Sequence, residues 1–420
     1  FWLKQLKDVL MLSEEMCFWL LCIAVLLISP SGRAQVQRSR QVFVFRHCVR
    51  STSPKLKHSG SKKFKTKDAF TNHPPASYGV PSMWCTPKGV QSIERTGPLL
   101  KRFGGDMSRL KVVADTDQRC VDTAAAFLRG LGQDDTDYTI NASIFDTLHG
   151  SKPACKAGYS HSDLAAEVRA RLASVPMPWD LTAAKAELQD VIGVGAAGPL
   201  VEMPGPEVED DGELIGSVSV MKYFSQDLMY TYLSDIEYMN LTAVQRYRFD
   251  AWEHWHRSVS KINSKTVTKN VALLLAIFDE LTSSESAISL FVGHDGNLDG
   301  LAAILNVTWD APPYMGGDLL PTPPGSALFF EYWPGSDAVT VSFLYPVLGD
   351  AANDRESLHL RQSAVLSGIG LAELRARAVR NLHLFPGALT CYMHAGPEIS
   401  RPGLLMLVSG AASVVLCALS

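Results

Sequence analysis

Three short apolar runs stand out along the chain, and each ends in polar residues capable of chemistry. They are QVFVF at 41–45, RLKVVAD at 109–115 and AISLFVG at 287–293. A short apolar run bounded by polar residues is typical of a buried strand, and the ends of parallel strands meet at one edge of a sheet. We therefore predict an α/β fold with a mostly parallel sheet and a site along one edge of it.

A long region with helical periodicity separates the second run from the third. It is clearest in SDLAAEVRARLASV from Ser162 and in RYRFDAWEHWHRSVSKI from Arg246. This region is too long for a single crossover between parallel strands. We expect residues 151–286 to form an inserted, mainly helical subdomain, and residues 35–150 and 287–395 to form the α/β core.

The pattern after the third run changes from helical to alternating. Residues 298–305 predict a helix, and ALFFEYW and AVTVSFLYP then alternate apolar and polar positions. Alternation with a period of two is typical of strands, so we predict an antiparallel pair there.

Both ends of the chain are hydrophobic in a way that predicts routing signals. The run at 17–28 has the length of the apolar part of a secretory signal and small residues follow it up to Ala34, so we expect residues 1–34 to be a signal peptide region. Residues 396–420 are apolar after a short polar stretch, which is typical of a GPI-attachment signal, and a C-terminal transmembrane anchor is the alternative. Both interpretations predict a secreted, cell-surface, vacuolar or lysosomal protein.

Composition agrees with this route and excludes one class of partner. The chain has 420 residues, 46% of them hydrophobic, which suits one large domain with an insert or two or three small domains. Its formal net charge of -4 gives no case for binding nucleic acid. Asn141, Asn240 and Asn306 begin glycosylation sequons.

The cysteines form an odd set once the hydrophobic ends are set aside. Of eight cysteines, Cys17, Cys22 and Cys417 lie in those ends. At least one of the others must be a free thiol or pair outside the chain. These are Cys48, Cys85, Cys120, Cys155 and Cys391.

The first strand runs directly into the loop Arg46-His47-Cys48-Val49-Arg50. Two guanidiniums that flank an imidazole are costly unless an anion lies between them, because arginine stays charged and needs acceptors. The guanidinium fork binds phosphate oxygens in pairs, so we interpret the loop as a phosphate site. A surface loop that is basic by chance is the alternative for this string alone.

The other two strands end in residues that complete such a site. Arg119, in ADTDQR, can supply a third guanidinium for a phosphoryl group. In GHDGNL, His294 can hold the phosphoryl group and Asp295 can protonate the leaving oxygen. The sequence has no His pair at i, i+4 and no CxxC spacing, so we expect no metal and no other cofactor.

Together these segments resemble the histidine acid phosphatases, a branch of the histidine phosphatase superfamily, and are most similar to bacterial periplasmic phytases and glucose-1-phosphatases. RHCVRS looks like the family's RHG-x-R-x-P signature, ADTDQR like its second-arginine segment and GHDGNL like its HD signature. WCTPKG, SIFDTL and TPPGSALFFEYW also fit in order and separation, so the similarity extends from about Val42 to Trp333.

The resemblance implies a three-layer, phosphoglycerate-mutase-like core and an acid phosphatase that hydrolyses small-molecule phosphate monoesters in two steps. His47 would attack phosphorus, Asp295 would protonate the leaving alcohol, and water would then hydrolyse the phosphohistidine. The transferred group would be bound by Arg46, Arg50, Arg119 and His294.

Two positions depart from the family pattern. Cys48 stands in place of Gly and Thr52 in place of Pro. A Cβ can hinder backbone angles or close approaches that glycine allows, so a slow enzyme or a silent phosphate-ester-binding protein of the same fold is the alternative function. We interpret Cys48 as an inert small residue rather than an activated thiol, because the His/Arg set already explains the site.

The sequence does not define the substrate, so inositol phosphates and sugar phosphates both stay open. It also leaves the oligomeric state open. Ser53, Lys55 and Asn297 are weaker candidates for substrate contact, and Asn297 can instead orient its loop. A basic run after the nucleophile loop predicts either a solvated surface loop or a rim that attracts polyphosphorylated substrates. It consists of Lys55, Lys57, His58, Lys62, Lys63, Lys65 and Lys67.

The resemblance also implies a disulfide between Cys155 and Cys391, because the related bacterial enzymes have a bridge in a comparable place and an extracellular protein can keep one. A bond between Cys85 and Cys120 is a weaker prediction, because Cys120 directly follows Arg119.

Overall fold

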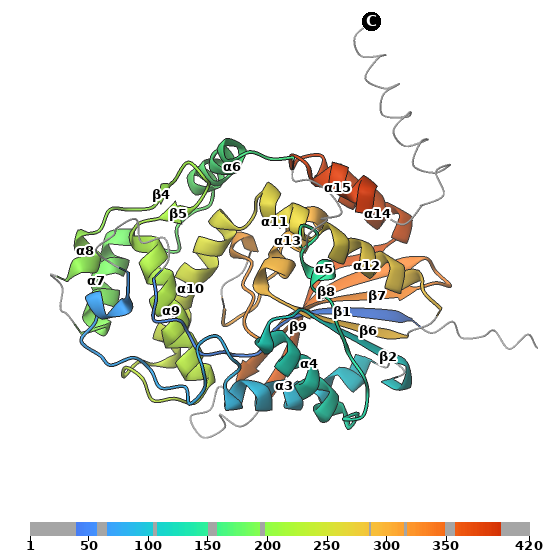
Figure 1. Ribbon diagram of the computed structural model, residues 1–420, viewed down its shortest axis with the longest axis horizontal. Coiled ribbons are helices and arrows are strands. Elements are labelled where there is room, and N and C mark those ends of the chain that lie inside the picture. Colours follow the sequence, from blue (N-terminus) through green and yellow to red (C-terminus); the bar gives the residue numbers. More distant parts are fainter. Residues whose placement is uncertain are drawn as a thin grey trace, which may run out of the picture.

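A central sheet organises the chain, as Figure 1 shows. The computed structural model describes residues 39–56, 65–103, 107–149, 158–193, 198–284, 287–314, 317–348 and 358–395. The strands of this sheet are β1 (Arg40–Arg46), β2 (Leu110–Ala114), β3 (Thr139–Ile140), β6 (Ile288–Gly293), β7 (Ala327–Trp333), β8 (Ala338–Leu348) and β9 (Leu358–Ile369). Within the described residues they make one seven-stranded sheet in the order β3-β2-β6-β1-β7-β8-β9.

Half of this sheet is parallel and half antiparallel. The three predicted strands are β1, β2 and β6; β6 lies between the other two and is parallel to both. The predicted antiparallel pair is β7 and β8, and β9, which the sequence did not predict, extends it. The α/β fold is therefore confirmed.

The core has three layers because neighbouring residues of β1 point to opposite faces of the sheet. Phe43 and Phe45 belong to the hydrophobic cluster on one face, and Val42 and Val44 to the cluster on the other. The first face is covered by α3 (Pro87–Leu100) and α4 (Gln118–Leu131). The second is covered by α5 (Ala142–Phe145), α11 (Ser264–Lys269), α12 (Val271–Thr282), α13 (Asp295–Leu305), α14 (Leu371–Leu382) and α15 (Ala388–Ala395).

A second group of elements lies beside the sheet and has its own hydrophobic core (Figure 1). Helices α9 (Ser217–Leu233) and α10 (Ala243–Ser260) pack against each other and bury Phe224, Trp252 and Trp255 completely. The 151–286 stretch also supplies α12, which packs on β1. The elements of this helical group are α6 (His161–Ser174), α7 (Leu181–Val191), α8 (Pro199–Glu202), α9 (Ser217–Leu233), α10 (Ala243–Ser260) and the hairpin of β4 (Glu207–Val208) and β5 (Leu214–Ile215).

The disulfide pattern corrects one prediction from the sequence. Cys48 is bonded to Cys85, and Cys120 is a buried free thiol, so the Cys85–Cys120 pairing was wrong. The bonded Cys48 is not an activated thiol, as the sequence analysis interpreted it, but the sequence does not show that residues 48 and 85 meet. Cys391 is also disulfide-bonded, but Cys155 lies outside the described residues and their pairing stays a prediction.

The predicted signal peptide region, 1–34, and the predicted C-terminal signal or anchor, 396–420, also lie outside the described residues. Among the residues that are described, no helix has both the length and the apolar character needed to cross a membrane.

Candidate active site

The register of the parallel strands brings the two predicted histidines together. Arg46, the last residue of β1, pairs with Gly293, the last residue of β6, and the His47 N–H donates to the Gly293 carbonyl at 2.9 Å. A Cβ at residue 293 would lie 2.4 Å from Asn297 Oδ1, so glycine is needed for this close approach. The rings of His47 and His294 follow, with centroids 5.4 Å apart.

His47 is held as a neutral imidazole. Its side chain is buried, and its Nδ1 lies 2.8 Å from the Cys48 carbonyl oxygen. Burial lowers the pKa of His47 well below its ordinary value, and the positive charges of His294 and Arg119 lower it further. With Nδ1–H donating to the carbonyl, Nε2 carries the lone pair. This is the protonation state that a nucleophile requires.

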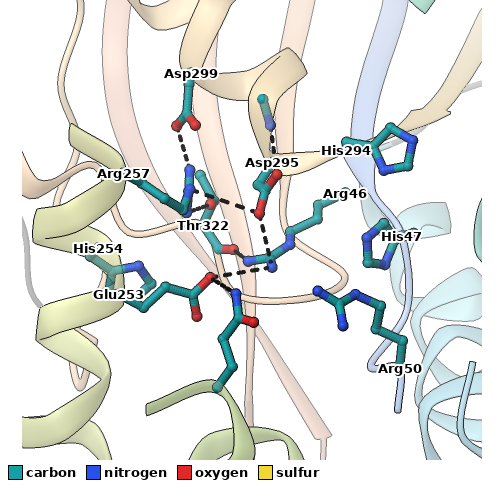
Figure 2. Close-up of polar contacts among 12 residues, drawn as sticks. Arg46, His47, Arg50, Glu253, His254, Arg257, His294, Asp295, Asp299 and Thr322 are labelled. Atoms are coloured by element: carbon teal, nitrogen blue, oxygen red, sulfur yellow. Dashed lines mark hydrogen bonds and ion pairs between the residues drawn. The ribbon is translucent and has the colours of Figure 1, made fainter. Parts of the chain in front are cut away.

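Arg46 lies beside His47 (Figure 2), and its side chain is buried. It donates to the Thr322 carbonyl and to the Tyr230 hydroxyl at 2.5 Å, and it lies 3.2 Å from Asp295 Oδ2. Burial lowers the pKa of Arg46, but Tyr230, Asp295 and Glu253 outweigh it and raise the pKa above its ordinary value. A fixed positive charge therefore stands beside His47.

Two further arginines approach the same space. Figure 2 shows the guanidiniums of Arg46 and Arg50 directed toward the region beside His47. Arg50 stacks over the Tyr230 ring at 5.3 Å, and Arg119 Nη2 lies 3.3 Å from His294 Nδ1. The Nε atoms of all three arginines are buried without a hydrogen-bond partner in the described part of the chain. Buried donors left unused are costly, so this arrangement favours binding of an oxyanion.

His294 carries a positive charge because two carboxylates hold its proton. Its Nε2 lies 3.0 Å from Asp115 Oδ2 and 3.2 Å from Asp117 Oδ2. Burial lowers the pKa of His294, but these hydrogen bonds outweigh it and keep the pKa well above its ordinary value. The two aspartates belong to ADTDQR, where the sequence analysis singled out Arg119 alone.

Asp295 begins α13 and faces two arginines. Its Oδ2 lies 3.2 Å from Arg46 Nη2 and 3.8 Å from Arg257 Nε. Burial raises the pKa of Asp295, but Arg46 and Arg257 outweigh it and hold the pKa well below its ordinary value. The carboxyl group is therefore ionised in this structure. Its side chain is 32% exposed, which also favours the charged form.

Helix α10 supplies site residues that the sequence analysis missed. Its start is fixed by a capping box in which Thr242 and Gln245 satisfy each other's backbone N–H groups. Arg257, a buried residue of α10, donates to Asp299 of α13 and to the Thr322 hydroxyl. Figure 2 shows it on the side of Asp295 opposite His47.

Glu253, one turn before Arg257 on α10, lies 3.9 Å from Arg46 Nη2. Lys222 of α9 is near enough to Glu253, Asp295 and Arg257 for their charges to change its pKa. Burial lowers the pKa of Lys222 to about 8; the charge of Lys261 acts in the same direction, and Glu253 and Asp295 act against it. A lysine in this environment still carries a proton at neutral pH. It gives the helical side of the site a second positive charge besides Arg257.

The weaker candidates take different positions. Asn297 is buried, accepts from the His294 N–H at 2.7 Å and donates to Phe145 and Asn270, so its side chain orients the loop. Ser53 accepts from the backbone N–H of Lys55, and the lysine side chain is exposed.

The basic run after the nucleophile loop is not uniformly exposed. Lys65 is exposed, whereas Lys67 is buried in an ion pair with Asp227 at 2.5 Å, so the prediction that Lys67 belongs to a surface run or rim was wrong. The ion pair attaches this segment to α9. The other members, Lys57, His58, Lys62 and Lys63, lie outside the described residues.

Comparison with known proteins settles the fold. No protein-family model and no curated protein matches the chain. The solved phytase of Hafnia alvei is similar, with a TM-score of 0.64 and 20% identity over 83% of this chain and 97% of that one. The Citrobacter braakii phytase gives 0.65 and 18% over 81% and 97%, and a Klebsiella sp. phytase gives 0.64 and 16% over 87% and 98%.

The chain has the histidine acid phosphatase fold. The resemblance inferred from RHCVRS, ADTDQR and GHDGNL is thereby confirmed at the level of fold. The Hafnia alvei phytase has also been solved in complex with myo-inositol hexakis sulphate. At identities of 20% or less, the role of each residue in this chain has to be argued from its own geometry.

Proposed function

We propose that this chain is a phosphomonoesterase that works through a phosphohistidine on His47. The observation that carries the proposal is the neutral, buried imidazole of His47 among three arginines and a protonated His294. These cations neutralise the charge of a phosphate monoester, and the Nε2 lone pair of His47 is available to attack.

The reaction is a double displacement at phosphorus. In the first step the His47 Nε2–P bond forms and the ester P–O bond breaks, with its electron pair going to the leaving oxygen. That oxygen takes a proton from Asp295. In the second step the carboxylate accepts a proton from water, whose oxygen attacks phosphorus and releases His47 and orthophosphate.

The charge on Asp295 sets the pH at which this works. Asp295 is ionised beside Arg46 and Arg257. A bound phosphoryl group takes over donors of Arg46 and brings negative charge close to the carboxylate, and both effects raise the pKa of Asp295. Activity should therefore be highest in mildly acidic solution, where the substrate complex holds the proton.

The helical side of the site favours substrates whose leaving group is itself anionic. Lys222 and Arg257 lie near Asp295, on the side where the leaving group departs. Inositol phosphates and sugar bisphosphates carry such an anion, and the Hafnia alvei phytase binds a hexasulphate of inositol. We infer polyphosphorylated polyols as the preferred substrates.

The disulfides favour a site of action outside the cytosol. Cys48 and Cys85 form one bond and Cys391 takes part in another, and such bonds persist in oxidising compartments. This supports the proposed secretory route, to the cell surface, the exterior or a vacuolar or lysosomal compartment.

Hydrolysis of p-nitrophenyl phosphate, phytate and glucose-1-phosphate between about pH 3 and 8, a range that spans the ordinary pKa values of carboxyl and imidazole groups, tests the proposal. Wild type should hydrolyse the first two, and His47→Ala should lose turnover while keeping its circular dichroism spectrum. His359→Ala is the matched control, because His359 is exposed on the edge strand β9. Equal activity of wild type and His47→Ala would contradict the proposal.

A further inference from the structure

The disulfide between Cys48 and Cys85 lies directly beside the proposed nucleophile. Cys48 follows His47 in the chain, and the bond joins it to a segment 37 residues further on. Both cysteines are buried, at 1% and 5% exposure. The backbone of Cys48 is not left-handed, so a residue with a Cβ fits at the position where the family has glycine.

The cross-link continues a short ladder between the nucleophile loop and the segment before α3. Arg50 lies opposite Cys85 in an isolated antiparallel bridge. The next N–H, that of Ser51, donates to the Trp84 carbonyl at 2.8 Å. The covalent bond thus lies between the two groups that the loop contributes to the site, His47 and Arg50.

Thr123 of α4 connects the same loop to the third arginine. The Cys48 N–H donates to Thr123 Oγ1 at 2.8 Å, and this hydroxyl donates to the Arg119 carbonyl at 2.6 Å. Thr123 is completely buried. Cys85 Sγ also lies against that carbonyl, 3.4 Å from its oxygen. The disulfide and one hydroxyl therefore meet at the turn of helix that presents Arg119.

We propose that the Cys48–Cys85 disulfide and Thr123 form a positioning unit for the active site, one that fixes His47 and Arg50 relative to Arg119. The proposal rests on the phosphatase function proposed above. In-line attack needs the nucleophile and the phosphate ligands in one fixed geometry, and a misplacement of about 1 Å can cost about 100-fold in rate. Without the unit, backbone hydrogen bonds and the hydroxyls of Ser51 and Thr86 would still hold the loop, but these bonds do not connect it to Arg119.

Two variants of the full chain test the unit from its two sides. Cys48→Ala/Cys85→Ala removes the bond without leaving a thiol, and Thr123→Val removes both hydrogen bonds at nearly constant volume. With p-nitrophenyl phosphate, well below the melting temperature, each should lower kcat roughly 10- to 100-fold. Each should also weaken binding of orthophosphate, measured by calorimetry, because Arg50 and Arg119 no longer converge.

Two controls separate positioning from simple stabilisation. Thr123→Ser keeps the hydroxyl and should restore kcat to within about threefold of wild type, since both hydrogen bonds remain. Cys391→Ala removes a disulfide cysteine outside the site and should leave kcat unchanged even where its melting temperature falls. Peptide mapping without reduction should find Cys48 linked to Cys85 in the wild type.

The proposal is overturned if mapping finds Cys48 as a thiol, or if either variant keeps the kcat and the phosphate affinity of wild type. It is also overturned if Cys391→Ala loses as much kcat as the double variant. If no ester is turned over by wild type, the proposed function fails, and the phosphate affinities then test the positioning unit alone.

Discussion

Replacing Asp295 by Asn keeps the shape of the side chain but removes its charge and its acid proton. General acid catalysis contributes about 10²- to 10⁴-fold, so kcat for esters with poor leaving groups, such as inositol phosphates, should fall by that factor. Aryl phosphates should lose much less, because p-nitrophenolate departs without a proton. The loss should therefore grow with the pKa of the leaving alcohol.

The same substitution should tighten the binding of phosphate. In the structure Asp295 Oδ2 lies 3.2 Å from Arg46 Nη2 and 3.8 Å from Arg257 Nε, so the carboxylate competes with the ligand for these donors. One freed hydrogen bond from a charged donor is worth about 1.5–3 kcal/mol. Orthophosphate should then inhibit Asp295→Asn about 10- to 100-fold more strongly than wild type.

The assay is a series of alkyl and aryl phosphates, with kcat plotted against the pKa of the leaving group and with the orthophosphate inhibition constant measured alongside. Asp134→Asn, an exposed carboxylate outside the site, is the matched control. An equal loss on both classes of ester would mean that Asp295 maintains the geometry and that the proton comes from another group. Weaker phosphate inhibition would refute the competition for Arg46.

Three further outcomes follow from the charges around the site. Arg257→Met should lower the free energy of unfolding, measured by urea denaturation, by about 3–5 kcal/mol, because Asp299 stays buried without its partner. The double variant Arg257→Met/Asp299→Leu should recover most of the lost stability. The pKa of His294 is raised in the folded state, so the protonated histidine stabilises the fold fully below pH 6.5, and this stabilisation is lost as the pH rises through the folded pKa. The difference in the free energy of unfolding between wild type and His294→Gln should therefore shrink over that range, and a constant difference would contradict the shift. Because the pKa of Lys222 is about 8, the wild-type KM for phytate should rise above that pH. Lys222→Met should raise the KM for phytate about tenfold at pH 6 and leave the KM for p-nitrophenyl phosphate unchanged. Equal effects on the two KM values would mean that Lys222 does not contact the substrate.

The sequence was sufficient for the residues that follow strands. Arg46, His47, Arg119, His294 and Asp295 stand at or just beyond the ends of three buried strands, and parallel pairing brings such positions to one edge. The fold, and the fact that these five residues lie close together, were therefore predictable from local sequence patterns.

The helical side of the site could not be found in the same way. Arg257 and Glu253 lie within a helix that also carries Phe249, Trp252 and Trp255, and no motif marks them. The sequence did contain one indication of these residues: Asp250, Glu253 and Arg257 are spaced so that they lie on one face of a helix that also carries large aromatic residues. Such a polar stripe between apolar positions indicates a second buried surface.

The disulfide was missed for a different reason. Cys48 and Cys85 are 37 residues apart, and their pairing depends on how the nucleophile loop packs against the start of α3. Cysteine counting predicted that a thiol would remain free, and Cys120 is that residue within the described part of the chain. Counting does not predict which two cysteines meet.

Trapping of the covalent intermediate tests the central claim most directly. Wild type mixed with ³²P-labelled p-nitrophenyl phosphate is quenched within milliseconds, digested and mapped under alkaline conditions that preserve phosphohistidine. We predict label on the peptide that contains His47 and no label in His47→Ala. Label on any other residue, or turnover by wild type without labelled protein, would contradict a phosphohistidine mechanism at this site.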